Sequence, residues 1–127
     1  MNADRPLPTA MAIILLLTSA VFFLLGTFFI LVPVAGGRVY GLETHNASAL
    51  FYVRAIGLRD LAVASYILGL TVVGHRPAPA ILLAFTTVIP TGDLLLLGLS
   101  GTATVINYVL HAISLIGFAV LAFWVRP

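Results

Sequence analysis

The sequence of 127 residues contains no cysteine and no lysine, and it has few charged residues of any kind. The absence of cysteine excludes disulfides, thiolate metal sites and a cysteine nucleophile. Charged residues make up 8% of the chain, against about 25% in soluble domains, while hydrophobic residues make up 61%. So few charges cannot cover a water-exposed surface, which favours contact with lipid. The six arginines are not clustered on one segment, so we expect no nucleic-acid partner.

Long apolar segments are what the sequence has instead, and four of them predict membrane-spanning helices. We place the spans at residues 9–32, 47–73, 78–99 and 104–125, in a single membrane domain covering residues 1–127. A span of about 20 residues crosses a bilayer as a helix, which satisfies its own backbone hydrogen bonds in lipid. The first segment is longer than the apolar region of a cleaved signal peptide, so we expect it to be retained. The predicted fold class is all-α, a four-helix transmembrane bundle in a multi-pass membrane protein.

The arginines outside the spans predict the orientation of the bundle. Four spans place both termini on one side, together with Arg5, Arg76 and Arg126. Arg38 lies in the opposite loops, within a polar segment predicted for residues 36–46. The positive-inside rule therefore predicts that the N and C termini are both cytoplasmic.

Four charged residues fall inside the predicted spans, where charge is costly. Arg54, Arg59 and Asp60 lie on the second span and Asp93 on the third. Each unpaired charge near a helix centre costs about 2.5–3.5 kcal/mol on insertion scales. We therefore expect these side chains to face the bundle interior and to pair, with Arg54 free to extend to the membrane interface.

Counting residues from the turns places several of these groups at one depth. Asp60, Asp93 and His111 come from three different spans, and each lies on the order of 10 Å below the outer surface at 1.5 Å per residue. With the adjacent Arg59 they form the predicted catalytic group. The predicted substrate-binding residues surround them: Arg54, Tyr52, Tyr66 and Asn107.

Helical spacing suggests how the second span is used. Tyr52, Arg59 and Tyr66 repeat every seven residues and share one face. Gly57, Asp60 and Ala64 form a second face of small residues, and close approach there is expected to seat Asp60 against the third or fourth span. Pro90, three residues before Asp93, predicts a kink in the third span.

The charged group leaves several interpretations open. The leading hypothesis is a site for a hydrophobic small molecule, with acid/base chemistry by Asp60 and Asp93, Arg59 as anion partner and His111 as proton relay. Isomerisation, cyclisation and epoxide opening all suit such a site. The alternatives are a non-catalytic protein whose buried charges are structural, and a small ion- or proton-conducting oligomer.

Expectations about ligands and partners follow from the same residues. Asp60, Asp93 and His111 have the chemistry of metal ligands but lack any local ligand spacing, so we expect no metal and no cofactor. The expected partners are membrane lipids and a lipophilic small molecule, and a homo-oligomer remains open.

The segment from Phe51 to Asp60 carries a family resemblance. An aromatic–x–Arg segment leads there into Gly-x-Arg-Asp, and the chain also has Gly-x-Arg at 74–76, Pro-x-x-Asp at 90–93 and His111 on the last span. This set resembles a family of small four-span membrane proteins catalogued as a domain of unknown function in fungi and bacteria. The likeness covers about residues 47–115 and departs from the family at residues 64–65, where Ala-Ser replaces Leu-Gly. It implies the four-helix topology and no reaction, and it marks Arg54, Arg59, Asp60, Asp93 and His111.

Overall fold

The computed structural model describes residues 6–126, which form six helices and no strand apart from one isolated bridge between Pro6 and His75. The helices are α1 (Thr9–Leu31), α2 (Pro33–Tyr40), α3 (Ala47–Val73), α4 (Pro77–Thr86), α5 (Val88–Ser100) and α6 (Val105–Val125). Four are long and apolar enough to cross a membrane when α4 and α5 are counted as one span. The predicted all-α fold with four spanning helices is confirmed.

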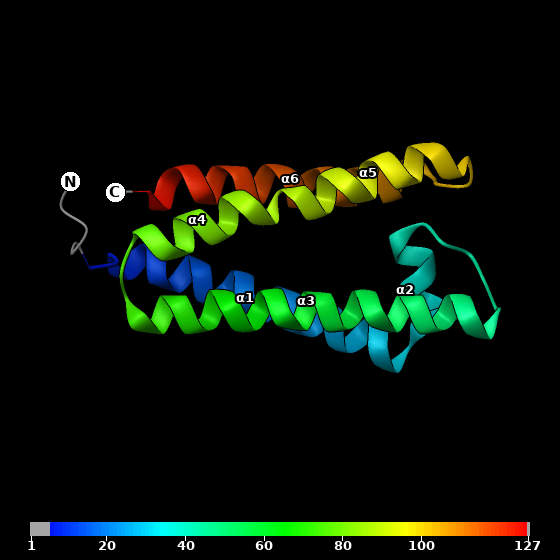
Figure 1. The fold of residues 1–127 in the computed structure, drawn as a ribbon, viewed down its shortest axis with the longest axis horizontal. Helices are drawn as coiled ribbons and strands as arrows, with labels where there is room; N and C mark the ends of the chain where they lie inside the picture. The colour runs from blue at the N-terminus through cyan, green and yellow to red at the C-terminus, as the bar shows by residue number, and fades with distance from the viewer. Residues whose placement is uncertain (1–5, 127) are drawn as a thin grey trace.

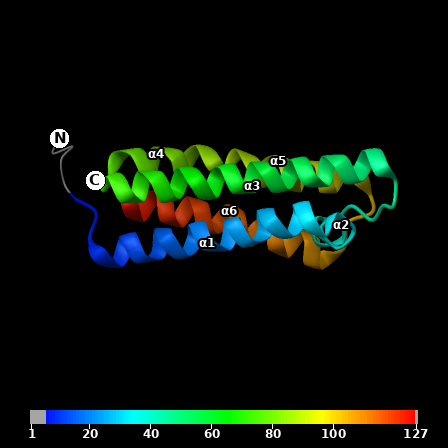
Figure 2. The same ribbon diagram turned by 90° about the horizontal axis from the view of Figure 1, so that it is seen from below.

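The bundle consists of two helix pairs. α1 packs along α3, and α6 packs along α4 and α5, so that the two pairs lie against each other as two layers (Figure 1). Seen after a quarter turn, α2 lies at the end of the bundle opposite the first and last described residues (Figure 2). Arg5, one of the arginines used to predict orientation, lies outside the described residues, and the cytoplasmic placement of the termini stays a prediction.

The contact between α1 and α3 depends on two glycines. A Cβ atom on Gly57 would lie 2.6 Å from the carbonyl oxygen of Gly26, and a Cβ on Gly26 would lie 2.6 Å from the carbonyl oxygen of Gly57. Further along the same pair of helices, the Ser19 hydroxyl donates to the Ala64 carbonyl at 2.8 Å. The predicted small-residue face thus does make a close approach, but the expected partner was wrong. It packs on the first span, because small residues on α1 complement it there.

Replacing Gly57 with alanine is expected to destabilise the bundle by about 1–3 kcal/mol, because the new methyl group meets a backbone oxygen and the helices must separate. The matched control is Gly69→Ala on the same helix, where no other group lies within 4 Å of the new Cβ. That variant should be neutral or gain up to about 1 kcal/mol of helix propensity. Thermal unfolding in detergent measures both, and equal effects would contradict the close crossing.

The third span is interrupted between α4 and α5, at Thr87. Pro90 has no N–H to donate to the Thr86 carbonyl, and its ring crowds that carbonyl. At the interruption, the Thr87 N–H donates to the Ala84 carbonyl at 3.3 Å, a bond to the third preceding residue and not to the fourth as in an α-helix. The helix is therefore interrupted three residues before the proline, while a kink in the direction of the span stays a prediction. Beyond it, α5 buries Pro90, Asp93 and Leu97 on one face.

The predicted polar loop at residues 36–46 contains the end of a helix. Pro33 occupies the first turn of α2, where its missing N–H is harmless, and Gly41 ends the helix with a φ of +112°. α2 runs from the layer of α1 and α3 towards the layer of α5 and α6 (Figure 1), and its last residue, Tyr40, lines a cavity together with residues of the spanning helices. The loop prediction was wrong for residues 36–40.

Candidate functional site

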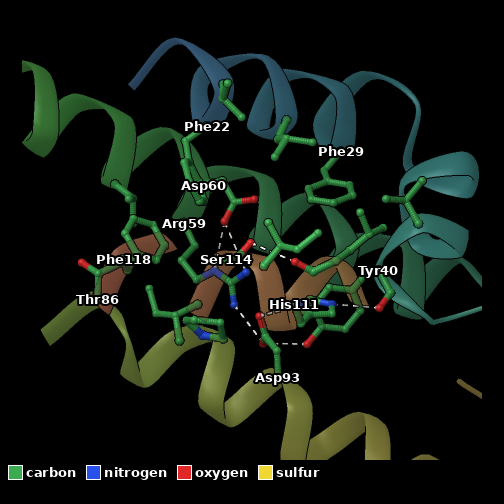
Figure 3. A pocket seen from close by; sticks show the side chains of 18 residues that line it. Phe22, Phe29, Tyr40, Arg59, Asp60, Thr86, Asp93, His111, Ser114 and Phe118 are labelled. Atoms are coloured by element: carbon green, nitrogen blue, oxygen red, sulfur yellow. Dashed lines mark hydrogen bonds and ion pairs between the residues drawn. The ribbon is translucent and has the colours of Figure 1, made fainter. Parts of the chain in front are cut away.

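Arg59 lies at the centre of a buried charged network (Figure 3). Its Nε and Nη2 atoms each lie 3.3 Å from Asp60 Oδ1, and its Nη1 atom lies 3.3 Å from Asp93 Oδ1. Asp60 and Asp93 are each only 5% exposed. One guanidinium from α3 thus joins a carboxylate on its own helix to a carboxylate on α5. The structure therefore brings Asp60 and Asp93 together through Arg59.

Asp93 receives a contact from each of three other elements. Beside Arg59 of α3, the Tyr40 hydroxyl of α2 donates to Oδ1 at 2.8 Å, and His111 Nδ1 of α6 lies 3.4 Å from Oδ2. Both carboxylate oxygens are therefore occupied. Asp93 organises the network and has little capacity left for another ligand.

His111 is held with oxygen atoms at both ring nitrogens. Nδ1 faces Asp93, and Nε2 lies 3.1 Å from the backbone carbonyl of Tyr40. A neutral imidazole carries hydrogen on one nitrogen only, so donation to both oxygens requires the imidazolium. With His111 in that form, two cations balance the carboxylates of Asp60 and Asp93, and the network is neutral overall.

Tyr40 keeps its phenolic proton in this setting. Burial raises the pKa of the Tyr40 hydroxyl, and the hydrogen bond to Asp93 and its negative charge raise it further. The ring also packs edge-on against His111, with centroids 4.9 Å apart. Tyr40 therefore acts as a neutral donor that fixes Asp93 and the imidazole beside it.

A cavity of about 270 Å³ lies beside the network and is lined by residues from all six helices. The charged and phenolic groups lie together, and the other lining side chains are apolar except for those of Thr86 and Ser114 (Figure 3). The rings of Phe22 and Phe118 meet there with centroids 5.0 Å apart and join α1 to α6. The other apolar wall residues include Leu25, Phe29, Val63 and Ile89. A mostly apolar pocket with a few convergent polar groups is typical of a small-molecule site.

Asp60 differs from Asp93 because only one of its two carboxylate oxygens accepts a hydrogen bond from the described residues. Both contacts from Arg59 go to Oδ1, and within residues 6–126 Oδ2 has no hydrogen-bond partner. The Asp60 side chain lines the cavity. Arg59 has five N–H groups and uses three of them in the contacts above, so two remain. The cavity wall thus offers one free acceptor beside free donors.

None of the four predicted substrate-binding residues lines the cavity, and three of them are exposed. Tyr52 and Tyr66 are exposed on the outer surface of α3. Arg54 is also exposed, and its Nε lies 3.3 Å from the Ile30 carbonyl. Seven-residue spacing places both tyrosines near Arg59 on the helix, but the long arginine side chain extends inward to the carboxylates. Their role in substrate binding stays a prediction without a contact to the cavity.

Asn107 is buried, and its amide is fully used elsewhere. Its Oδ1 accepts from the Thr104 N–H and hydroxyl at 2.8 and 2.7 Å, which caps α6. Its Nδ2 donates to the carbonyls of Arg38 and Val39 at 3.0 and 2.9 Å. Asn107 therefore fastens the end of α2 to α6, and through α2 it holds Tyr40 in place. Substrate contact by Asn107 stays a prediction.

Tyr40 is the main site residue that the sequence predictions missed. A signal was present, because the eight residues from Pro33 to Tyr40 begin with a proline and are followed by Gly41, the asymmetry typical of a short helix. Nothing local to that segment shows that the helix turns inward. Within residues 6–126, no group of three or more His, Asp or Glu side chains is placed to hold a metal ion.

The sequence profile of the family described as Domain of unknown function (DUF4267) matches residues 19–125. The chain belongs to this family. No curated protein and no solved structure matches the chain. The predicted resemblance to an uncharacterised family is thus confirmed, while its fungal and bacterial range stays a prediction. The matched region of this DUF4267 protein includes the whole charged network.

Proposed function

We propose that this DUF4267 protein, a multi-pass membrane protein with buried Arg, Asp and His side chains, binds a hydrophobic small molecule in its cavity and transfers protons on it. The observation that carries the proposal is the free Oδ2 of Asp60, whose largely buried side chain lines a mostly apolar cavity. A carboxylate in such a place is suited to accept a proton from a bound molecule. The Arg59 contact holds it in position.

Asp60 and His111 have different roles in this scheme. Asp60 takes a proton from one atom of the substrate, and the electron pair released forms a new double bond or ring bond. His111, which also lines the cavity, gives up the Nε2 bond to the Tyr40 carbonyl and donates that proton to another atom of the same molecule. The product has the formula of the substrate, as in an isomerisation, a cyclisation or the opening of an epoxide to an unsaturated alcohol. Passage of the proton from Asp60 to His111 restores the site.

Arg59, Asp93 and Tyr40 are positioning residues in this scheme. Arg59 stabilises the Asp60 carboxylate, while Asp93 orients the imidazole through Nδ1 and Tyr40 holds Asp93. Such shells support acid/base pairs by fixing geometry and charge. If the network were purely structural, the Arg59–Asp93 ion pair would be enough to join α3 to α5. A second carboxylate, with a free oxygen beside a cavity, would not be needed.

Deuterium transfer tests the proposal and does not require an identified substrate. Reconstituted protein is incubated in D₂O with a lipid extract, and mass spectrometry follows lipids that gain deuterium or change retention at unchanged formula. Wild type is expected to convert at least one component, and Asp60→Asn is expected to lose about 10²–10⁴-fold of the rate, the usual contribution of a general acid or base.

The matched control is Glu43→Gln, which removes an exposed acid outside the cavity. It should leave the rate unchanged. Thermal unfolding of each variant shows whether it is folded. Equal rates in wild type and a folded Asp60→Asn variant would contradict the proposal, as would deuterium content no higher with wild type than with empty liposomes.

A further inference from the structure

We infer that the cavity opens sideways into the membrane between α1 and α6, and that its occupant is an uncharged lipid-soluble molecule with a hydroxyl group at one end. This inference rests on the proposed function and gives it a route and a substrate class. It depends on which lining residues are exposed and on which hydrogen-bonding groups in the wall are free.

The exposed lining residues all lie on one side. Val21 of α1, Val39 of α2 and Leu110 and Ile113 of α6 line the cavity and are exposed at the same time. The deep wall is closed, because its lining residues on α3, α4 and α5 are buried or half-buried. An opening therefore lies between α1 and α6, which meet within the cavity at the Phe22–Phe118 ring pair.

The rim of this opening suits a lipid-soluble molecule. All four exposed lining residues are aliphatic, and they belong to helices apolar enough to span a membrane or, for Val39, to α2 beside them. An ion crossing such a rim would lose its hydration without a compensating partner. The end of the bundle near α2 is closed by the Asn107 bonds to α2 and by Gly41, where a Cβ would lie 2.5 Å from Leu97. Access from the bilayer is thus the open route.

Charge balance indicates that the occupant is neutral. When both ring nitrogens of His111 donate to their oxygen partners, the imidazolium and Arg59 balance Asp60 and Asp93, and a carboxylate or an ammonium would then add an unpaired charge in a low-dielectric site. A hydroxyl group can bond to the free acceptor and to a free donor of the wall at the same time. It can donate to Asp60 Oδ2 and accept from a remaining N–H of Arg59.

The volume agrees with a molecule that is only partly enclosed. The cavity of about 270 Å³ is slightly smaller than the ~300–1,000 Å³ of pockets that enclose most of a drug-sized molecule. That is enough for the polar end of a single-chain lipid and the carbons next to it. The remainder of the chain would extend between α1 and α6 into the bilayer.

Photolabelling with three matched probes tests both parts. Liposomes containing wild-type protein receive a long-chain alcohol, acid or amine, each with the same diazirine-bearing chain, and labelled residues are found by mass spectrometry. The alcohol should label cavity residues at least about tenfold more than the acid or amine, a ratio that corresponds to 1.4 kcal/mol. Equal or stronger labelling by the acid or the amine would overturn the neutral class.

Ile113→Trp tests the route, because a bulky ring at the rim should obstruct it. Ile113 is 61% exposed and lines the cavity, whereas Ile116, on the same helix, is 62% exposed and does not line it. Ile113→Trp should lower alcohol labelling at least about tenfold, and the control Ile116→Trp should leave it unchanged. Unchanged labelling in a folded Ile113→Trp variant would overturn the lateral route.

The two proposals fail separately. Absence of cavity labelling by all three probes would overturn this inference, while deuterium transfer lost in Asp60→Asn would still support the proposed chemistry. Conversely, alcohol labelling blocked by Ile113→Trp supports the route and the binding site even if Asp60→Asn leaves deuterium transfer unchanged.

Discussion

Arg59→Leu is expected to lower the free energy of unfolding by about 3–5 kcal/mol, the usual effect of removing one partner from a buried ion pair. Arg59 contacts both Asp60 and Asp93, and each carboxylate is 5% exposed. Without the guanidinium, Asp60 has no donor within residues 6–126, and Asp93 keeps only Tyr40 and His111. The loss therefore comes mainly from buried negative charge left without its cation.

Thermal or denaturant unfolding in detergent measures this effect, and Arg54→Leu is the matched control. Arg54 lies on the same helix and is exposed, with one long contact to a carbonyl, so its replacement should change stability by no more than about 0.5 kcal/mol. Arg59→Lys should fall between the two, because an ammonium keeps the charge but cannot span both carboxylates in one plane. Similar losses for Arg59→Leu and Arg54→Leu would contradict the central place of Arg59.

Replacing the whole network with apolar side chains is expected to recover the stability that Arg59→Leu loses. The variant combines Tyr40→Phe, Arg59→Met, Asp60→Leu, Asp93→Leu and His111→Leu. Its free energy of unfolding should equal that of wild type or exceed it by about 1–4 kcal/mol, as found when buried ionic groups give way to apolar ones of similar size. The reason is that the desolvation of all four charged groups disappears together with their attraction.

The control for the apolar variant carries only Arg59→Met and His111→Leu, which replace the two cationic members of the network. It leaves both acids buried without a charged partner, so it should be less stable than Arg59→Leu alone. Unfolding curves of the three variants and wild type, recorded in one detergent, give the order directly. An apolar variant as unstable as Arg59→Leu would contradict the expectation and favour a structural role for the charges.

The spanning helices could be predicted closely because the signal is local. Runs of about 20 apolar residues specify a spanning helix by length alone, and α3 occupies residues 47–73, as predicted. The meeting of Asp60, Asp93 and His111 could also be predicted, because charged groups in a membrane must pair and depth can be counted along each helix. Neither step depends on which helices are neighbours.

The features that could not be predicted depend on which helices lie next to one another in the bundle. The Gly57 face packs on α1 because Gly26 stands opposite, and residues on α3 alone do not reveal that partner. Tyr40 reaches Asp93 only because α2 runs towards the layer of α5 and α6 (Figure 1) and Asn107 holds it there. Tyr52 was grouped with Arg59 by helical angle, but the flexible stem of the arginine leads its head group inward while the tyrosine ring stays outside.

The apolar variant also separates the two principal interpretations of the network. If the charges exist for stability, removing them as a set should harm the fold. If they exist for chemistry on a bound molecule, the fold should survive and the chemistry should not. Buried ionic groups retained at a cost in desolvation free energy are typical of functional sites in membranes.

The most direct test of the proposed chemistry is therefore deuterium transfer to lipids by this apolar variant, once its unfolding curve shows a stable fold. We expect wild-type stability with the rate reduced to that of empty liposomes. A stable apolar variant that still transfers deuterium at the wild-type rate would contradict the proposal.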